Sequence, residues 1–579
     1  MRVSEVRISG LRSIAPGVRL LTDEEGGNRV WRLIWEAQSV RLVLPVNPGL
    51  GRPLLSALIG ANSAGKSTVL LALHHFFGAT TKLDTDLFHG KTSVAPVVVQ
   101  VTLVGALAQP TTWQQAHCAR RGKQWSLTVA SVWQGDRRLR LLQRSDGLFV
   151  RQSARDRAEV EKLLPAWRVI WADSVRRPET DLERPGLLSD LVDDLLAHAG
   201  GHGALGRVAA LLAELSTLLA HREDPAWEAV AQLEQRLGVG LAAITPQPKQ
   251  VRLQLGAGLP SLRDLFARSA LQIDDGVALD LERHGLGVQR SLVVAVLHVW
   301  CEVVRRSTQD YLFAIEEPEI YLHPHATRVL LAQLEEIAGR DQVIFTTHAG
   351  DFVNRTPPDQ VAVVRRDARG HTRVTQPDLR SLSADTLWKV QRYLQEDRSD
   401  MFFARAVILV EGQAEYFALP AFARTLGIEL DAVGVSVVFV NGIGNFAVYH
   451  TLLAALGIPH VVVMDGDGEA PARRRQYADL GDTVVVLSQD FEQMLVDGLT
   501  PERLLAVVNE CLARRGRPPR TVLGDVRRRN RELADLGKPL VGRVAGELLR
   551  RDEVRRLEPV VTALVAAVRL AGRFNEIIT

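Results

Sequence analysis

Residues 55–77 read LSALIGANSAGKSTVLLALHHFF: an apolar run, a turn that holds two glycines, and a second apolar run. The turn from Gly60 to Ser67 has the spacing G-x-x-x-x-G-K-[ST], whose glycines let successive backbone amides cradle phosphate oxygens. Lys66 would place a positive charge on the β- and γ-phosphates, and Ser67 would offer a hydroxyl to Mg²⁺. The stretch therefore predicts a strand, a phosphate-binding loop and a helix that together bind a nucleotide.

The flanking sequence argues against a chance match in an ordinary loop, because the turn lies between an apolar strand and an apolar helix. The positive end of that helix would add to the attraction for phosphate. The residues expected at the nucleotide in this stretch are Gly60, Asn62, Gly65, Lys66, Ser67 and Thr68.

The composition is that of a globular protein, with 46% apolar and 24% charged residues, and 579 residues suggest three or four domains. The three cysteines are scattered and have no metal-site spacing, which favours a reducing compartment over a disulfide framework. No apolar run has the length of a membrane span, and we expect no signal peptide, because the sequence from Met1 has the pattern of a strand. We expect a soluble cytoplasmic protein with no membrane partner.

Segments rich in β-branched and aromatic residues surround the loop. Those after the helix predict a subsidiary antiparallel sheet beside the nucleotide, and residues 167–174 predict a returning strand. The expected strands before the loop are 3–14, 30–37 and 40–46, and those of the subsidiary sheet are 94–107, 125–134 and 139–152.

Residues 186–241 have helical periodicity and few β-branched residues. A helical block between β-rich parts of one nucleotide-binding domain is typical of an insertion. Because an isolated helical hairpin cannot bury its own apolar stripe, we predict that the insertion forms a dimer interface. The alternative is packing inside the monomer.

Two further stretches supply groups that suit a nucleotide site. Gly285, Gly287 and Gln289 precede a long apolar helix, and they form either a plain loop or a second helix N-terminus for a phosphate. The apolar run 312–315 ends in Glu316 and Glu317, and adjacent carboxylates on a buried strand are costly unless a cation lies there.

One of these two carboxylates can hold Mg²⁺ while the other polarises the attacking water. We expect Glu316 to bind the metal and Glu317 to act in catalysis. His348 ends another apolar strand, which we expect beside the strand of the phosphate loop, where the histidine could sense the γ-phosphate.

These segments, GANSAGKST, HGLGVQRS, IEEPEIYLHP and TTHAGDF, follow the motif order of ABC-type ATPase heads, which the chain therefore resembles. The resemblance implies a Walker A loop, a signature motif, a Walker B strand and a histidine switch. It also implies ATP as the nucleotide, and Gly287 and Gln289 as signature residues that contact it. The signature lacks the usual serine before its second glycine.

After residue 364 the chain becomes polar and then helical, which we interpret as a link between domains. A second α/β pattern follows, with acidic residues at or beyond the ends of several apolar strands. Carboxyl ends of parallel strands are where open α/β sheets place ligands. Carboxylates from separate strands repel one another, so divalent metals are the natural neutraliser; a solvated acidic rim without metal is the alternative.

The order strand, Glu-Gly, helix, strand and DxDxE resembles a TOPRIM domain. An ABC-type head followed by TOPRIM resembles the OLD (overcoming lysogenisation defect) family, which includes the nuclease subunit of the Gabija antiphage system. The resemblance implies a DNA endonuclease or nickase that uses Mg²⁺ or Mn²⁺. It implies that Lys538 acts in catalysis, alongside Glu317 and His348 in the ATPase. The implied metal ligands are Glu411, Glu415, Asp465, Asp467 and Glu492, with Ser67 and Glu316 holding the nucleotide's metal.

Arginine clusters in the last 110 or so residues support a DNA partner, since basic side chains track the phosphate backbone. Solvated helix faces are the alternative explanation for part of them. We expect a homodimer or a larger homo-oligomer and a possible helicase partner. The competing function is an ATP-driven DNA-binding or repair protein of the SMC/RecF kind, with TOPRIM as a scaffold.

The predicted fold is thus an α/β chain: an ABC-type ATPase head with a helical insertion, followed by a TOPRIM domain with a parallel sheet. The predicted boundaries are 1–180 and 251–395 for the two parts of the ATPase, 181–250 for the insertion, and 396–579 for TOPRIM.

Overall fold

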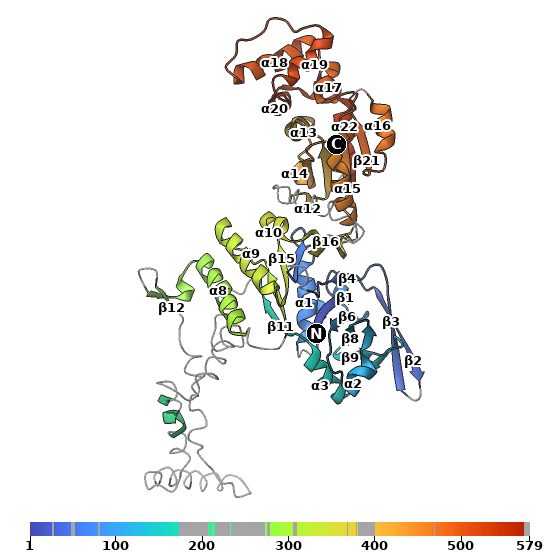
Figure 1. The fold of residues 1–579 in the computed structure, drawn as a ribbon, viewed down its shortest axis with the longest axis vertical. Coiled ribbons are helices and arrows are strands. Elements are labelled where there is room, and N and C mark those ends of the chain that lie inside the picture. Colours follow the sequence, from blue (N-terminus) through green and yellow to red (C-terminus); the bar gives the residue numbers. More distant parts are fainter. Residues whose placement is uncertain are drawn as a thin grey trace. The chain divides into compact units, whose positions relative to one another are not determined.

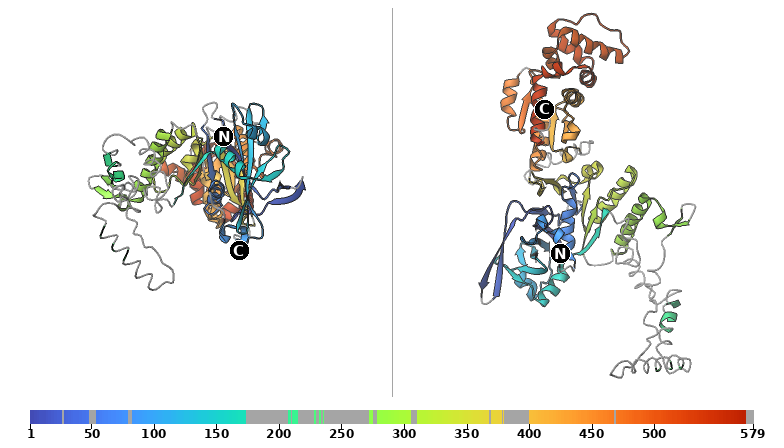
Figure 2. Two further views of the ribbon diagram at one scale, coloured as in Figure 1. Left: turned by 90° about the horizontal axis from the view of Figure 1, so that it is seen from below. Right: turned by 180° about the vertical axis from the view of Figure 1, so that it is seen from behind.

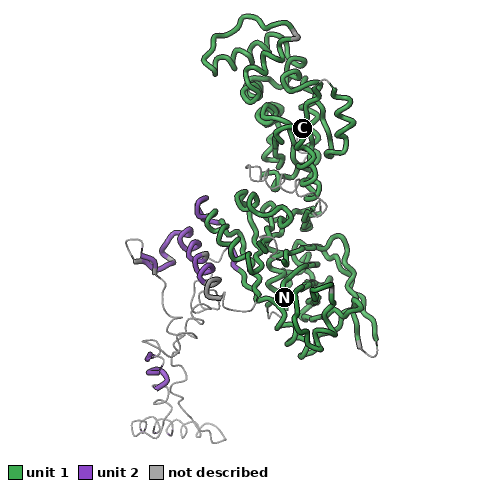
Figure 3. Tube along the Cα trace, in the orientation of Figure 1, with its two compact units in different colours: residues 1–169, 309–319, 327–579 green, residues 170–308, 320–326 purple. Residues whose placement is uncertain are grey.

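The computed structural model divides the described chain into two compact units, residues 1–169, 309–319 and 327–579, and residues 170–308 and 320–326 (Figure 3). No helix in the described part is both long enough and apolar enough to cross a membrane. The described residues are 1–25, 28–47, 53–78, 82–172, 272–274, 278–304, 310–367, 369–377, 379, 400–467 and 469–572, with short pieces between 207 and 235.

A six-stranded sheet carries the phosphate loop of the first unit (Figure 1). Its strand order is β11 (Ala166–Ile170), β14 (Tyr311–Glu316), β15 (Gln342–Thr347), β5 (Leu55–Ile59), β16 (Val361–Arg366) and β17 (Thr372–Thr375). Strands β14, β15, β5 and β16 run parallel. The predicted strand next to the phosphate loop is confirmed, because β15, which ends just before His348, pairs with β5.

A nine-stranded antiparallel sheet lies in the same unit, as the β-rich segments predict. Figure 2 shows its β2–β3 ribbon, in dark blue, extending from the rest of the sheet. Helix α1 (Lys66–Phe77) contacts both sheets, through β14 of one and β6 of the other. The strands are β1 (Arg2–Ser9), β2 (Val18–Glu25), β3 (Asn28–Trp35), β4 (Val40–Val43), β6 (Val97–Gly105), β7 (Ala119–Arg121), β8 (Gln124–Gln134), β9 (Arg137–Gln143) and β10 (Phe149–Arg151), with helices α2 (Thr112–His117) and α3 (Ala154–Leu163).

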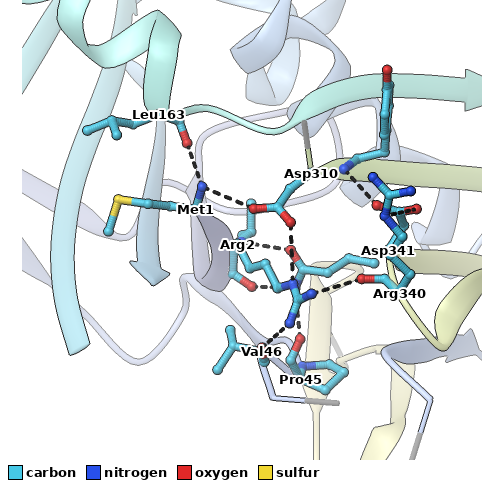
Figure 4. A network of polar contacts seen from close by, with 11 residues as sticks. Met1, Arg2, Pro45, Val46, Leu163, Asp310, Arg340 and Asp341 are labelled. Atoms are coloured by element: carbon cyan, nitrogen blue, oxygen red, sulfur yellow. Dashed lines mark hydrogen bonds and ion pairs between the residues drawn. The ribbon is translucent and has the colours of Figure 1, made fainter. Parts of the chain in front are cut away.

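Polar side chains join the two sheets at β1 (Figure 4). The Arg2 guanidinium donates to the carbonyls of Val46 and Arg340, both at 2.9 Å. The buried Gln342 side chain pairs with both backbone groups of Val3 at 2.7 Å, in the way that a neighbouring strand would. Because these buried polar groups satisfy one another, the sheets are held in one register.

The first part of the polar stretch after residue 364 belongs to the phosphate-loop sheet, so its interpretation as a link was wrong for residues 365–375. Strand β17 pairs antiparallel with β16 and forms the edge of the phosphate-loop sheet. A turn held by Asp367 closes this hairpin, and Thr372 is fully buried. Buried contacts, which local polarity does not reveal, therefore decide the structure here. The helix predicted within the link lies mostly outside the described residues, apart from α12 (Asp400–Phe403) at its end.

In the second unit, helix α8 (Leu286–Val304) follows the hairpin of β12 (Gln272–Asp274) and β13 (Ala278–Asp280). We expected Gly287 and Gln289 to precede this helix, but both lie in its first turn. A glycine at this position destabilises the helix less than one in its interior, because the first backbone amides of a helix make no hydrogen bonds within it. The predicted insertion at 181–250 lies outside the described residues except for a few helical pieces.

A four-stranded parallel sheet begins after residue 405, as the second α/β pattern predicts. Its order is β19 (Val435–Phe439), β18 (Ala406–Val410), β20 (His460–Met464) and β21 (Thr483–Val486). One continuous apolar core joins the sheet to the helices that follow it, so residues 406–572 form one folded body. Its helices are α13 (Gln413–Leu426), α14 (Leu430–Val433), α15 (Phe446–Ala455), α16 (Ala470–Gln476), α17 (Phe491–Gly498), α18 (Pro501–Arg514), α19 (Val526–Ala534), α20 (Lys538–Leu548), α21 (Arg551–Arg555) and α22 (Glu558–Leu570). The remaining helices of the first unit are α10 (Gly350–Arg355) and α9 (Pro324–Ala338), whose first turn belongs to the second unit.

The contact between α13 and α20 depends on Gly542. A Cβ atom on this residue would lie 2.1 Å from the carbonyl oxygen of Ala414, so Gly542→Ala must push the two helices apart. We expect the free energy of unfolding, measured with urea, to fall by about 1–3 kcal/mol. Gly444→Ala is the control, because a Cβ there meets nothing within 4 Å. Equal stability of the two variants would contradict this packing.

Candidate nucleotide and metal sites

The phosphate loop requires glycine at both of its fixed positions. Gly60 and Gly65 have φ angles of 148° and 110°, in the region that side chains disfavour. A Cβ on Gly60 would lie 2.0 Å from the carbonyl oxygen of Val364, and one on Gly65 would lie 2.2 Å from the Thr372 hydroxyl. The loop opens into a cavity of about 660 Å³, whose lining includes Asn62, Gly65, Lys66, Ser67, Thr68 and Glu317.

The Lys66 ammonium lies where the loop's own oxygens hold it. Its Nζ donates to the carbonyls of Gly60 at 3.0 Å and Ala61 at 3.2 Å, and it lies 2.6 Å from His348 Nε2. Burial lowers the pKa of Lys66, and the carboxylates of Glu317, Glu319 and Glu316 oppose that shift. The Lys66 ammonium is thus close both to these carboxylates and to the cavity in which phosphates would bind.

The Nε2 atom of His348 can form a hydrogen bond with either of two neighbouring side chains, one at a time. Its Nε2 is 2.6 Å from Lys66 Nζ and 3.2 Å from Glu317 Oε1. Burial and the charge of Lys66 lower the pKa of His348, so the neutral ring is favoured. With a bare Nε2 the ring accepts from Lys66, and with a protonated Nε2 it donates to Glu317. The arrangement suits a residue that responds to the γ-phosphate.

Glu319 is a functional candidate that the sequence reasoning missed. Its Oε1 accepts from the Thr347 hydroxyl at 2.6 Å and from the backbone amides of His348 and Ala349 at 2.8 and 3.2 Å. The carboxylate therefore fixes the turn that presents His348. The repeated glutamates of the IEEPE segment were the available signal, but only the first two were interpreted.

The β16–β17 hairpin forms a wall of the cavity that the sequence did not predict. Arg366 Nε donates to the Ser63 carbonyl at 2.7 Å, and the Thr372 hydroxyl donates to the Ala64 carbonyl at 2.8 Å. His371 and Arg369 of the same hairpin also line the cavity. The hairpin therefore braces the phosphate loop and adds positive charge beside it.

Glu316 is not among the residues that line this cavity. Glu316 ends β14, the strand separated from β5 by β15. Gly287 and Gln289 belong to the second unit, where the Gln289 side chain donates to the His284 carbonyl at 2.8 Å. Their expected contact with a nucleotide stays a prediction.

Four carboxyl groups gather at the carboxyl edge of the four-stranded sheet. Glu411 directly follows β18, Glu415 lies in the first turn of α13, Asp465 follows β20, and Glu492 lies in the first turn of α17. The Asp465 amide donates to Glu411 Oε2 at 3.1 Å, which ties the ends of the two central strands together.

Three of these carboxyl groups are buried, and several of their oxygens lack hydrogen-bond partners in the described residues. Exposed fractions are 0% for Glu492, 4% for Glu415 and 7% for Asp465. Both oxygens of Glu492, one of Glu415 and one of Asp465 have no hydrogen-bond partner in the described part of the chain. Burial and neighbouring carboxylates raise the pKa of Glu415 to about 7 and that of Asp465 to about 8; burial also raises the pKa of Glu492. Such oxygens fit a cation, which would stabilise their charged forms.

Lys538 supplies the positive charge nearest to the cluster. Its Nζ lies 3.8 Å from Asp465 Oδ2 and 3.8 Å from Glu492 Oε2. Burial acts to lower the pKa of Lys538, but the carboxylates of Glu492, Asp465 and Glu415 outweigh it and raise the pKa. The lysine starts α20 and is half exposed, so it can also reach a bound phosphate.

The fifth predicted ligand, Asp467, is exposed and pairs with Arg473. As the side chains stand, no three acidic, histidine or cysteine groups among the described residues are arranged to hold an ion. The cluster therefore supplies suitable oxygens but not a finished coordination shell.

The C-terminal domain is rich in arginine, as the sequence indicates. Several pair with acidic groups, as Arg514 does with Glu510 and Glu547, which agrees with the solvated-face explanation. Others are exposed at the surface and could contact a phosphate backbone: Arg474, Arg475, Arg515, Arg517, Arg528, Arg531, Arg550, Arg551 and Arg555.

Comparison with known proteins identifies both domains. A model of the "Overcoming lysogenization defect protein-like, TOPRIM domain" matches residues 402–467, and one of the "AAA ATPase domain" matches residues 228–353. The first of these ranges contains Glu411, Glu415, Asp465 and Asp467, and the second contains Glu316, Glu317 and His348.

Three relatives are nucleases by name. The Old nuclease of Escherichia phage P2 is 24% identical over 44% of this chain and 46% of its own length. The OLD nuclease of Thermus scotoductus is 28% identical over 37% and 42%. Endonuclease GajA of Bacillus cereus is 24% identical over 27% and 26%. The chain thus spans less than half the length of these curated relatives. It combines an AAA-type ATPase domain with an OLD-like TOPRIM domain and is a relative of the OLD nucleases.

Proposed function

We propose that this protein is a divalent-metal-dependent DNA endonuclease or nickase whose activity is regulated by ATP. The observation that carries the proposal is the burial of Glu415, Asp465 and Glu492 together, with oxygens that lack partners, beside Lys538. A domain that served only as a scaffold would have no use for so costly a cluster. The nuclease names of the relatives support the same substrate class.

Glu411, Glu415, Asp465 and Glu492 would hold Mg²⁺ or Mn²⁺, with Asp467 as a further ligand. Bound there, the metal would supply Lewis-acid stabilisation of the oxygens in phosphodiester cleavage. Lys538 would neutralise negative charge that develops on the phosphate. The exposed arginines nearby would position the DNA backbone without reading its sequence.

The ATPase would regulate this site and would not supply its chemistry. In our proposal Lys66 holds the β- and γ-phosphates of ATP, Ser67 and Glu316 hold the nucleotide's Mg²⁺, and Glu317 polarises the attacking water. His348 reports whether a γ-phosphate is present. By resemblance to the OLD family, we infer a role in antiphage defence, with a possible helicase partner.

The first test changes the TOPRIM cluster alone. Asp465→Ala removes a carboxylate at the centre of the cluster, so we expect plasmid cleavage with Mg²⁺ or Mn²⁺ to fall by about a hundredfold or more, while ATP hydrolysis persists. Chelation should stop cleavage by the wild type, and added metal should restore it. The control is Asp479→Asn, an exposed acidic residue of the same domain. Cleavage by Asp465→Ala at the wild-type rate would contradict the assignment, and a wild type that never cuts would favour the SMC/RecF-like alternative.

The second test concerns ATP binding. Lys66→Ala should abolish binding of a fluorescent ATP analogue, because it removes the buried ammonium that the loop carbonyls of Gly60 and Ala61 hold at the edge of the cavity, where the phosphates would bind. Lys91→Ala is the matched control: this lysine also lines the cavity but is exposed, and its loss should change affinity by less than about threefold. Glu317→Gln should bind ATP and fail to turn it over. Unchanged affinity in Lys66→Ala would overturn the site.

The third test concerns assembly. ABC-type heads complete their nucleotide sites with the signature of a second head, so we propose a homodimer at least. Light scattering with and without ATP should give a mass of two chains or more. A stable monomer at micromolar concentration in both conditions would refute the proposal.

A further inference from the structure

A second basic cavity lies at the other end of the phosphate-loop helix. It has a volume of about 490 Å³, and its lining includes Arg138, Arg140, Arg151 and Arg157, with Gln152 and Glu161. Helix α1 separates the cavity from the phosphate loop: the helix has 12 residues and so is roughly 18 Å long. The cavity is therefore distinct from the nucleotide site described above.

Two of the four arginines form hydrogen bonds with backbone carbonyls at the end of α1. Arg138 donates to the carbonyls of Gly78 at 2.8 Å and Phe76 at 2.5 Å, and Arg140 donates to Phe76 at 3.0 Å. Together they bond one carbonyl in the last turn of α1 and the carbonyl of Gly78, the residue that caps this helix. Burial lowers the pKa of both, to about 9 for Arg138. Two full charges exceed the partial negative charge of a helix end, so the cavity keeps a positive excess.

Buried polar groups in the cavity lack partners. Gln152 is 6% exposed, and neither its amide oxygen nor its amide nitrogen has a hydrogen-bond partner among the described residues. Arg140 Nε is also buried without one. Because buried polar groups in proteins are nearly always satisfied, these donors and this acceptor indicate a ligand that bonds them.

The other side chains that line the cavity indicate the chemical class of this ligand. Arg151 and Arg157 are exposed, where they can receive a phosphate in charge-assisted hydrogen bonds. Glu161 offers a carboxylate to a hydroxyl or amino group. Phe77, whose ring stacks on Trp167 with centroids 5.3 Å apart, adds an apolar wall beside them. Phosphate, hydroxyl and a flat ring occur together in a nucleotide.

The geometry points to a second binding site for a mononucleotide-class ligand in this cavity, with its phosphate held by Arg151 and Arg157. The site is independent of the proposed nuclease activity and of ATP binding at Lys66.

The test uses full-length Lys66→Ala protein, in which the phosphate-loop site is disabled, and AMP as the probe in calorimetric titrations. We expect saturable binding of one AMP per chain. Adding Arg151→Ala and Arg157→Ala should weaken that binding by about tenfold or more, since each arginine contributes charge-assisted bonds. The control is Arg155→Ala. Arg155 is exposed and lies on α3, the helix that carries Arg157, but it does not line the cavity. Thermal melting should show that all variants are equally folded.

Further probes identify the source of the phosphate. Pyrophosphate should bind in the same arginine-dependent way but more weakly, and adenosine should not bind. Failure of AMP to bind Lys66→Ala, or binding that survives the double substitution, would overturn the proposal. So would arginine-dependent binding of a short single-stranded oligonucleotide in place of AMP, because the cavity would then be part of a DNA track.

Discussion

The burial of several carboxyl groups, together with their mutual repulsion, is the constraint that the C-terminal domain must satisfy. Parallel strands β18 and β20 bring Glu411 and Asp465 to one edge, and the helices that follow add Glu415 and Glu492. Removing several such charges from water is unfavourable unless positive charge is placed among them. Lys538 supplies one charge, and a divalent cation is the group that would supply the rest.

The ATPase half uses the same arrangement of strands for a different purpose. The carboxyl ends of β5, β14 and β15 present the phosphate loop, Glu317 and His348, which approach one another around Lys66. In both halves a parallel sheet delivers groups from distant parts of the sequence to one edge. Each domain nevertheless has its own acidic set, so in the proposed function each would hold its own metal and cleavage of DNA would not depend on hydrolysis of ATP.

The sequence predicted the strand–loop–helix at residues 55–77, the neighbouring strand of His348 and the acidic strand ends, because each depends on a short local pattern. It did not predict the β16–β17 hairpin, because Arg366 and Thr372, which hold the hairpin against the phosphate loop, bond to carbonyls of that loop 303 and 308 residues away in the chain. The role of Glu319 was missed for the same reason: its partners lie 28 to 30 residues away in the chain. Tertiary contacts of this kind leave little trace in local composition.

The central claim is that the buried acidic cluster binds a divalent cation, and binding of Mn²⁺ in the absence of nucleotide tests it most directly. Electron paramagnetic resonance would count free Mn²⁺ during titration of Lys66→Ala protein, whose phosphate-loop site cannot retain a nucleotide's metal. We predict that this protein binds Mn²⁺ and that Asp465→Ala in the same background weakens binding by at least about tenfold. Equal stoichiometry and affinity in the two proteins would contradict the account.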